Sequence, residues 1–414
     1  MLRFRDGVEQ RATAVELFFD LVFVFAITQL SRQLLQDLTV EGAARTLFLL
    51  LVVWWAWIYT TWMTNWFDPR HLSVRLVLIF SMLAAFLMAI AIPRAFGARA
   101  ALFAGGYVAL QLVRNTFIVL MTDDSEPLHG SWVRMWIGSI WIGAVWMLGA
   151  FAPDEHTRVT IWLFALVLDY GGPIAGFWAP GMGRTAATEW ELEHGHFVER
   201  FQTFVLIVLG ESIVITGATA SQLPLTPSRV LAITVAFIGT TVFWWLYFDE
   251  VADRAQAQLA AAGRRRGVLA RDAFTYLHIP IVAGMLVTAV GDELTIAHPG
   301  EPLHGSQLVA LIAGPVLYLV GHLLFELRMT RAVPRTRLVA TLVVLAISPL
   351  GTVLPVLVTW TLVYGTLAVV AAVETHARLW GRPGGVPRRG WLLPVGPRHG
   401  AALHARGDTV RAGD

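Results

Sequence analysis

The stretch ELFFDLVFVFAITQL, from Glu16 to Leu30, decides the fold. With its flank it is long enough to cross a bilayer, because a helix needs about 20 apolar residues to span the hydrocarbon core. It nevertheless begins with two carboxylates, Glu16 and Asp20, which lie one helical turn apart and share a face. The stretch therefore predicts a membrane-spanning helix whose first turns carry acidic side chains.

The composition extends this prediction to the whole chain. The 414 residues are 56% hydrophobic and 14% charged, whereas a soluble domain is usually about 25% charged. The mean hydropathy is +0.62. The absence of cysteine excludes disulfides, thiolate catalysis and cysteine metal sites. A net charge of +2 argues against a nucleic-acid partner. We predict an all-α integral membrane protein surrounded by a lipid bilayer.

Twelve apolar runs are long enough to be membrane-spanning helices. They lie near residues 16–36, 43–64, 74–93, 98–121, 132–151, 158–179, 199–219, 229–250, 272–291, 306–327, 336–354 and 356–376. The first fifteen residues are polar and no cleavage pattern follows them, so we expect no signal peptide.

The arginines predict the orientation. With a cytoplasmic N-terminus, most of them fall on the inside, including the run 264–266 and the C-terminal tail. The outside loops hold only Arg32, Arg45, Arg94, Arg99, Arg158 and Arg229. This asymmetry follows the positive-inside rule. We therefore predict a multi-pass protein of the bacterial plasma membrane with both termini in the cytoplasm.

Self-similarity divides the chain into two halves. The triplet 16–18 is echoed at 199–201, and Tyr170-Gly171 is echoed at Tyr364-Gly365. Six spans per half keep both halves in the same orientation, which predicts a two-fold axis along the membrane normal. The expected units are a cytoplasmic N-terminal segment (1–15), a first six-helix half (16–179), a cytoplasmic linker (180–198), a second six-helix half (199–376) and a disordered cytoplasmic tail (377–414).

Three stretches carry a resemblance to a known family. ATAVELFFDLVFVFAITQL near the start, HFVERFQTFVLIVLGESIVITG at mid-chain and WWLYFDE after it look like the bacterial low-temperature-requirement A family. The resemblance implies a multi-span membrane fold. It implies no reaction, because that family is named for a cold-growth phenotype and its biochemical activity is not established.

The first span has a second resemblance. Residues 18–28 are similar to the F-S-D-G-V-F-A-I-A-I-T signature of the endosomal and lysosomal potassium-leak channel family, whose first helix lines the pore. Phe18 and Asp20 match the signature, and Phe25 occupies the position of that family's pore constriction. Phe19 replaces the serine, and the second half has Thr203 where an aspartate would repeat the motif.

The acidic side chains differ in predicted depth. A carboxylate in the first turn complements the positive end of the helix dipole, which explains Glu16. Asp20 lies about 6 Å deeper, so it is either a cap or a group at the mouth of an ion pathway. Glu211 lies about 18 Å beyond Glu199, near mid-membrane, where capping cannot explain it. It is either a protonated, hydrogen-bonded side chain or a cation or proton site, and the rarity of buried carboxylates favours the site.

Asp169 lies at mid-span in the sixth run and precedes Tyr170-Gly171-Gly172-Pro173. Proline lacks an N–H group, so this run predicts an opened or kinked helix beside the carboxylate. Transporters often coordinate ions at such broken helices. The alternative is a packing kink in which Asp169 bonds the freed backbone groups.

Three further polar residues are predicted within the spans. Arg114 in the fourth run almost requires a carboxylate partner, for which Asp20, Asp169 and Glu211 are the candidates. His322 and Glu326 in the tenth run share a helical face, a spacing that suits either a proton relay or a single structural hydrogen bond.

We predict neither a metal site nor a cofactor. The stretch from Glu191 to His196 contains ligand-type side chains but lacks the spacing of a zinc site. No phosphate-loop motif occurs in the chain, so any energy source would be an ion gradient.

These residues predict a channel or secondary transporter for a monovalent cation, a proton or a small solute. Glu211 and Asp169 would bind the ion, Asp20 would shape the cytoplasmic mouth, and Arg114 would hold a carboxylate. The alternative is an integral-membrane enzyme acting on a lipid. That reading needs catalytic residues at one depth, whereas the deep carboxylates are scattered, so we predict no enzyme. A homodimer is left open.

Overall fold

A computed structural model describes residues 11–126, 128–249, 251–380 and 392–394. The long helices are α1 (Ala14–Gln36), α2 (Val40–Trp66), α3 (Leu72–Ala91), α4 (Ala100–Leu120), α5 (His129–Ala150), α6 (Glu155–Ile174), α7 (His194–Ser221), α8 (Pro227–Phe248), α11 (Ile279–Ala297), α12 (Gly305–Thr330), α13 (Arg335–Ile347) and α14 (Val356–Leu379). Shorter pieces connect them: η1 (Ile92–Arg94), η2 (Ala187–Glu189), α9 (Val251–Ala261), η3 (Gly263–Arg265), α10 (Arg266–Leu269), the π-helix η4 (Ala270–Tyr276) and η5 (Ser348–Thr352).

The helices confirm an all-α membrane protein. Within the described ranges, eleven helical segments are long and apolar enough to cross a membrane. The predicted sixth span is not among them, because α6 carries Glu155, His156 and Arg158 in its first turn and Asp169 near its end. The predicted ninth span is longer than expected, since η3, α10, η4 and α11 together form a segment from Gly263 to Ala297.

The predicted helix break beside Asp169 is wrong. Helix α6 stays helical through Gly171, Gly172 and Pro173, and ends at Ile174. Pro173 has no N–H to donate to the carbonyl of Asp169, four residues earlier, and the helix ends one residue after it. The chain then turns at Gly176, whose φ is +67°, a conformation that glycine adopts without steric cost.

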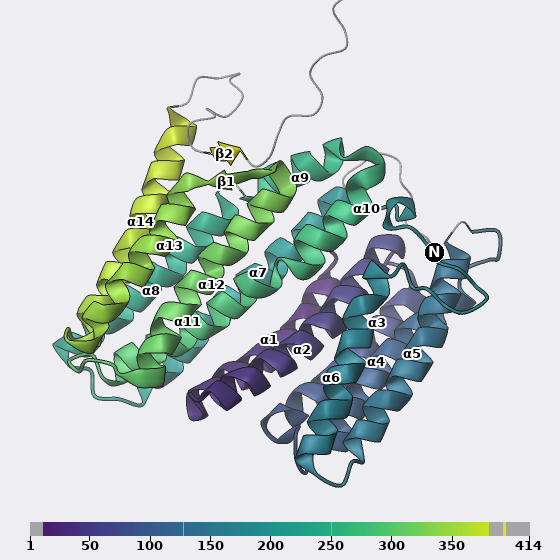
Figure 1. Cartoon of the computed structure of the whole chain (residues 1–414), viewed down its shortest axis with the longest axis horizontal. Helices are drawn as coiled ribbons and strands as arrows, with labels where there is room; N and C mark the ends of the chain where they lie inside the picture. The colour runs from purple at the N-terminus through teal and green to yellow at the C-terminus, as the bar shows by residue number, and fades with distance from the viewer. Residues whose placement is uncertain (1–10, 127, 250, 381–391, 395–414) are drawn as a thin grey trace, which may run out of the picture.

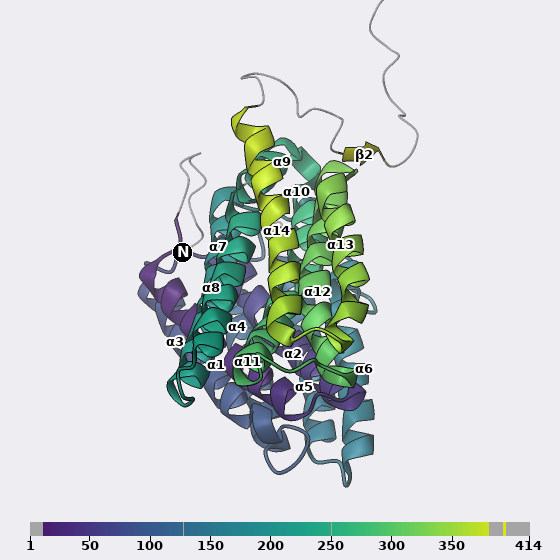
Figure 2. The same ribbon diagram turned by 90° about the vertical axis from the view of Figure 1, so that its left-hand side faces the viewer.

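Helices α1–α6 pack in one group and α7–α14 in another (Figure 1). In the first group α1 packs on α2 and α3, α3 on α4, α4 on α5 and α5 on α6. In the second, α7 packs on α8 and α11, α11 on α12, α12 on α13, and α14 on α13 and α8 (Figure 2). Helix α1 also packs against α7 and α11, and so joins the groups. The two-fold axis between the halves stays a prediction.

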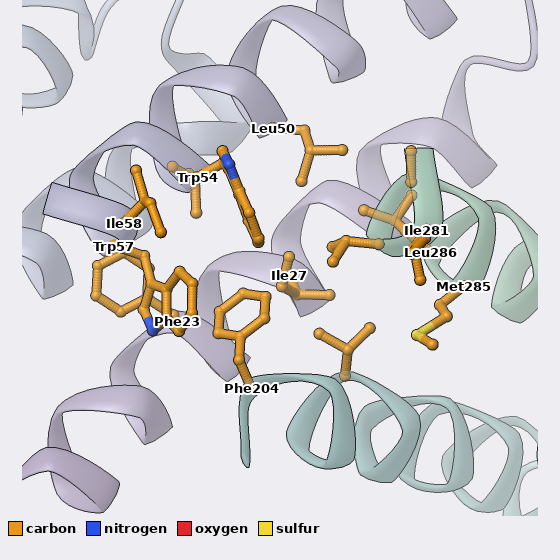
Figure 3. Close-up of a cluster of buried hydrophobic side chains, with 14 of the residues drawn as sticks. Phe23, Ile27, Leu50, Trp54, Trp57, Ile58, Phe204, Ile281, Met285 and Leu286 are labelled. Atoms are coloured by element: carbon orange, nitrogen blue, oxygen red, sulfur yellow. The ribbon is translucent and has the colours of Figure 1, made fainter. Parts of the chain in front are cut away.

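An apolar layer fills the contact between the groups (Figure 3). Phe23 and Ile27 of α1 face Trp57 of α2, Phe204 of α7 and Met285 of α11, and all five are buried. The rings of Trp57 and Phe204 lie 4.3 Å apart. We call these five residues the central apolar layer.

The C-terminal tail was predicted to be disordered. Its residues 381–391 and 395–414 lie outside the described part of the chain. Helix α14 extends the twelfth predicted span to Leu379. Strand β2 (Leu392–Pro394) pairs antiparallel with strand β1 (Ala332–Pro334), so the prediction of disorder does not hold for those three tail residues.

Candidate functional site

Asp20 pairs with an arginine of the second group of helices. Arg200 of α7 donates from Nη1 to Asp20 Oδ2 and from Nη2 to Oδ1, each at 2.7 Å. Trp57 Nε1 of α2 donates to Oδ1 at 2.8 Å. Both charged side chains are 0% exposed. The two parallel hydrogen bonds form the bidentate arrangement that makes arginine–carboxylate pairs strong and directional.

Glu16 has two roles. Its Oε2 accepts hydrogen bonds from the backbone N–H and the hydroxyl of Thr13, each at 2.8 Å, which caps the start of α1. Its Oε1 lies 2.8 Å from Nε2 of His196 of α7. The other ring nitrogen of His196 lies 3.2 Å from the side-chain amide of Asn65, which fixes the orientation of the ring.

Glu16, Asp20, His196 and Arg200 form one buried set, which we call the α1–α7 ion cluster. Each pair joins residues 180 positions apart. The two carboxylates are four residues apart on α1, and the two basic groups are four residues apart on α7. Glu16 therefore contacts His196 in one helical turn, and Asp20 contacts Arg200 in the next. Because the difference in residue number is 180 for both pairs, the two helices run parallel. The acidic first turns of α1 exist because α7 supplies their counter-charges.

Glu211 lies farther along the same helix contact. It is buried, and its carboxyl group hydrogen-bonds Thr28 of α1 and feels the charge of the Arg32 guanidinium. Its Oε1 is buried and has no hydrogen-bond partner among the described residues. Eleven residues separate Glu211 from Arg200, or about 16 Å of helix. The central apolar layer occupies this interval.

Asp169 belongs to a different network, inside the first group of helices. It accepts hydrogen bonds from Tyr107 Oη at 2.8 Å and Trp146 Nε1 at 2.9 Å. Gln111 Nε2 donates to the same tyrosine oxygen at 2.8 Å. Arg114 in turn donates from Nη2 to Gln111 Oε1. Arg114 therefore reaches a carboxylate only through Gln111 and Tyr107, and the direct partner predicted for it is not found among the described residues.

His322 and Glu326 contact different groups. Nδ1 of His322 lies 2.8 Å from Nη1 of Arg337, and Arg337 also donates to Glu374 at 2.9 Å. Within the described residues no hydrogen bond joins His322 to Glu326. Glu326 lies near Arg254 of α9. Burial lowers the pKa of Arg254 below its usual value, and the negative charge of Glu326 offsets part of that lowering. The predicted pairing of His322 with Glu326 is thus replaced by an arginine-centred network.

The two phenylalanines of the channel-like signature lie away from the α1–α7 contact. Phe18 is 59% exposed. Phe25 is half-buried and packs against Phe86 of α3 at 5.5 Å between ring centroids. Phe23, two residues earlier, lies in the central apolar layer instead (Figure 3). The constriction assigned to Phe25 stays a prediction, and the structure places it on the α3 side of α1.

Sequence reasoning missed several partners. His196 and Arg200 could have been found because they repeat the four-residue spacing of Glu16 and Asp20 with opposite charge. His196 lies in the stretch considered for metal ligands, where Glu193 caps α7 by accepting from two backbone N–H groups. Asp292 was also missed. It lies just past the predicted end of the ninth span, is buried, and accepts hydrogen bonds from Trp360 Nε1 at 2.7 Å and Tyr364 Oη at 2.8 Å.

The fold and the cluster define a class, a multi-pass helical membrane protein whose two groups of helices are joined by buried ion pairs. Residues 11–372 match the family described as Bacterial low temperature requirement A protein (LtrA). The chain belongs to that family. It is 34% identical over 335 residues to "Uncharacterized protein RA0937" of Rhizobium meliloti (strain 1021), an alignment that covers 80% of this chain and 81% of that protein. No solved structure matches.

These comparisons confirm the resemblance to the low-temperature-requirement A family. They do not show the likeness of the first span to potassium-leak channels, which stays a prediction.

Proposed function

We propose that the chain is a transport protein, a channel or secondary transporter for a cation, a proton or a small solute. Its pathway would follow the contact between α1 and α7, with both termini in the cytoplasm. The observation that carries the proposal is Glu211, a buried carboxylate between these helices whose Oε1 has no partner among the described residues. Intramembrane carboxylates facing a bundle interior mark ion and proton pathways.

The other two carboxylates on the α1–α7 contact already have basic partners among the described residues, unlike Glu211. Asp20 is neutralised by a bidentate arginine and Glu16 faces a histidine, so neither carboxylate is free to bind an ion in this conformation. Glu211 has a threonine as its hydrogen-bond partner, and Arg32, whose charge it feels, lies on the exposed face of α1. A cation or a proton at Glu211 would supply the partner that its Oε1 lacks among the described residues.

The central apolar layer would be the closed gate. Along α7, Phe204 lies between Arg200 of the α1–α7 ion cluster and Glu211, and along α1, Phe23 follows Asp20. Apolar constrictions exclude water and ions. A conformation that separates α1 from α7 would part this layer and the ion cluster together. We propose Phe23, rather than Phe25, as the constricting residue because Phe23 lies on this contact.

The positions of the other deep carboxylates support a transport role over lipid chemistry. Asp169 is held between α4 and α5, Asp292 against α14, and Glu211 against α1. A catalytic site would need acidic and basic groups to converge on one substrate. We therefore propose that the chain is not an enzyme.

Ion flux into proteoliposomes tests the proposal. Purified protein is reconstituted and potassium, sodium and proton gradients are applied separately. We expect wild-type flux for at least one ion, and a fall of about tenfold or more in Glu211→Gln, since removing an interaction of about 1.4 kcal/mol changes binding tenfold.

Glu41→Gln is the matched control, because the Glu41 side chain is 72% exposed and lies at the start of α2. Its flux should equal that of wild type. Liposomes that stay as tight as empty ones to all three ions would contradict an ion pathway. Equal flux in wild type and Glu211→Gln would remove Glu211 from it.

A further inference from the structure

An aromatic cavity surrounds Arg114, at a distance from the proposed α1–α7 pathway. Its walls include Tyr59 and Trp66 of α2, Phe177 and Trp190 of the linker region, and Arg271 of the π-helix η4. Its volume is about 20 Å³, and a single water needs roughly 10–15 Å³ measured in this way. The cavity is therefore large enough for one small ion and too small for an organic solute of several heavy atoms.

The cavity contains an unsatisfied positive charge. Arg114 is 0% exposed, and its Nη1 is buried without a hydrogen-bond partner among the described residues. Its other nitrogens donate to Gln111 and Asn115, which are neutral. No carboxylate lies within ion-pairing distance of it in the described part of the chain. A buried charge without a counter-charge is strongly destabilising, so this guanidinium calls for an anion.

The second arginine of the cavity is already satisfied. Arg271 donates to Asp272 at 2.8 Å and to the carbonyl of Pro173 at 3.1 Å. Asp272 in turn pairs with Arg328. Arg271 therefore has a carboxylate partner, whereas Arg114 has none among the described residues. Arg271, Asp272 and Arg328 together carry a net charge of +1, which adds to the positive charge of Arg114.

We propose that this cavity binds a small monovalent anion of halide size. One water could accept the Nη1 hydrogen bond but would leave the charge uncompensated. The walls are mainly apolar, with five aromatic residues among the eleven that line the cavity. They suit an ion that needs charge more than a set of directional hydrogen bonds. The Cζ atom of Arg114 lies over the Tyr59 ring, 4.9 Å from its centroid. This cation–π contact stabilises the guanidinium but leaves its full charge to be neutralised by an anion.

The segment that closes the cavity has unusual backbone geometry. Arg271 and Thr275 belong to the seven-residue π-helix η4. The carbonyl of Thr275 accepts from Trp54 Nε1 at 2.7 Å, and its hydroxyl accepts from Trp62 Nε1 at 3.2 Å. π-Helical turns are rare and occur frequently at functional sites. Here the turn brings Thr275 against α2 and completes the cavity wall with residues from the second group of helices.

Binding of radioactive chloride to the detergent-purified full chain tests the proposal. The protein is titrated in sodium gluconate at constant ionic strength, because gluconate is too large for the cavity. We expect saturable binding of one chloride per chain, competed by bromide and lost at least tenfold in affinity in Arg114→Gln. Arg75→Gln removes an exposed arginine at the start of α3 and should bind as wild type does.

A second variant keeps the result interpretable if Arg114→Gln does not fold. Met135 lines the cavity, and Met135→Phe fills it while leaving Arg114 in place. Chloride should raise the unfolding temperature of wild type relative to gluconate, because a ligand that binds only the folded state stabilises it. Met135→Phe should lose this rise.

Two results would overturn the site: no saturable chloride binding in wild type, or a chloride response in Met135→Phe equal to that of wild type. Neither depends on ion flux, so the outcome is separate from that of the proposed transport function.

Discussion

Arg200→Gln should destabilise the protein more than the double variant Asp20→Asn/Arg200→Gln. The single change leaves Asp20 buried without its counter-charge, and breaking a buried ion pair from one side costs about 3–5 kcal/mol. The double change removes both charges, and asparagine keeps an acceptor for Trp57 Nε1. Thermal unfolding of the detergent-purified variants, followed by loss of the monodisperse species, measures the order of stabilities.

The exposed pair of Arg45 and Glu41 provides the control. Their side chains are 36% and 72% exposed, and pairs of this kind contribute about 0–1 kcal/mol. Glu41→Gln should therefore change the unfolding temperature little, because Arg45 keeps its pair with Glu155 of α6. If Arg200→Gln costs no more than Glu41→Gln, or if the double variant is less stable than the single, the pair does not hold α1 and α7 together.

The contact between α11 and α12 should not tolerate a single added methyl group. A Cβ at Gly314 would lie 2.4 Å from Thr288 Oγ1 and 2.6 Å from the Thr288 backbone nitrogen. At Gly284 it would lie 2.4 Å from the backbone nitrogen of Tyr318. Membrane helices use such small residues to bring their backbones close together. Since backbone atoms cannot move aside cheaply, we expect Gly314→Ala to cost about 3 kcal/mol or more, the upper part of the range for overpacking.

Gly210→Ala in α7 is the matched control, because a Cβ there would meet nothing within 4 Å. Alanine is the better helix former by about 0.5–1 kcal/mol, so this variant should be as stable as wild type or slightly more stable. If Gly314→Ala lowers the stability and Gly210→Ala does not, the loss arises from the close contact between α11 and α12. Equal stability of Gly314→Ala and Gly210→Ala would show that α11 and α12 pack less closely than described.

The membrane architecture was readable from sequence because length and hydropathy define a spanning helix almost without tertiary information. The errors lie where that signal weakens. Helix α6 has charged residues near both ends, so its hydropathy falls below that of the other spans. The π-helix η4 has no recognisable signature in its residues, and only its contacts with Trp54 and Trp62 show why the chain takes that form.

The site was only half predictable. The burial of Asp20 and Glu211 and the partial burial of Asp169 followed from their positions within apolar runs, because the predicted depth of a residue depends only on its place along the span. Their partners depend on which helices touch, and no local pattern contains that information. The rule that a buried arginine pairs with a carboxylate failed for Arg114, since Gln111 and Tyr107 stand between it and Asp169.

The 180-residue separation within the α1–α7 ion cluster has a consequence for biosynthesis. At about 5–20 residues per second, the ribosome needs roughly 9–36 s to make the residues between Asp20 and Arg200. During that interval α1 is complete, but Arg200, the counter-charge of Asp20, has not yet been made. Helix α1 can therefore pack on α2 and α3 early, whereas its contact with α7, and the ion pair of Asp20 with it, can form only after α7 emerges.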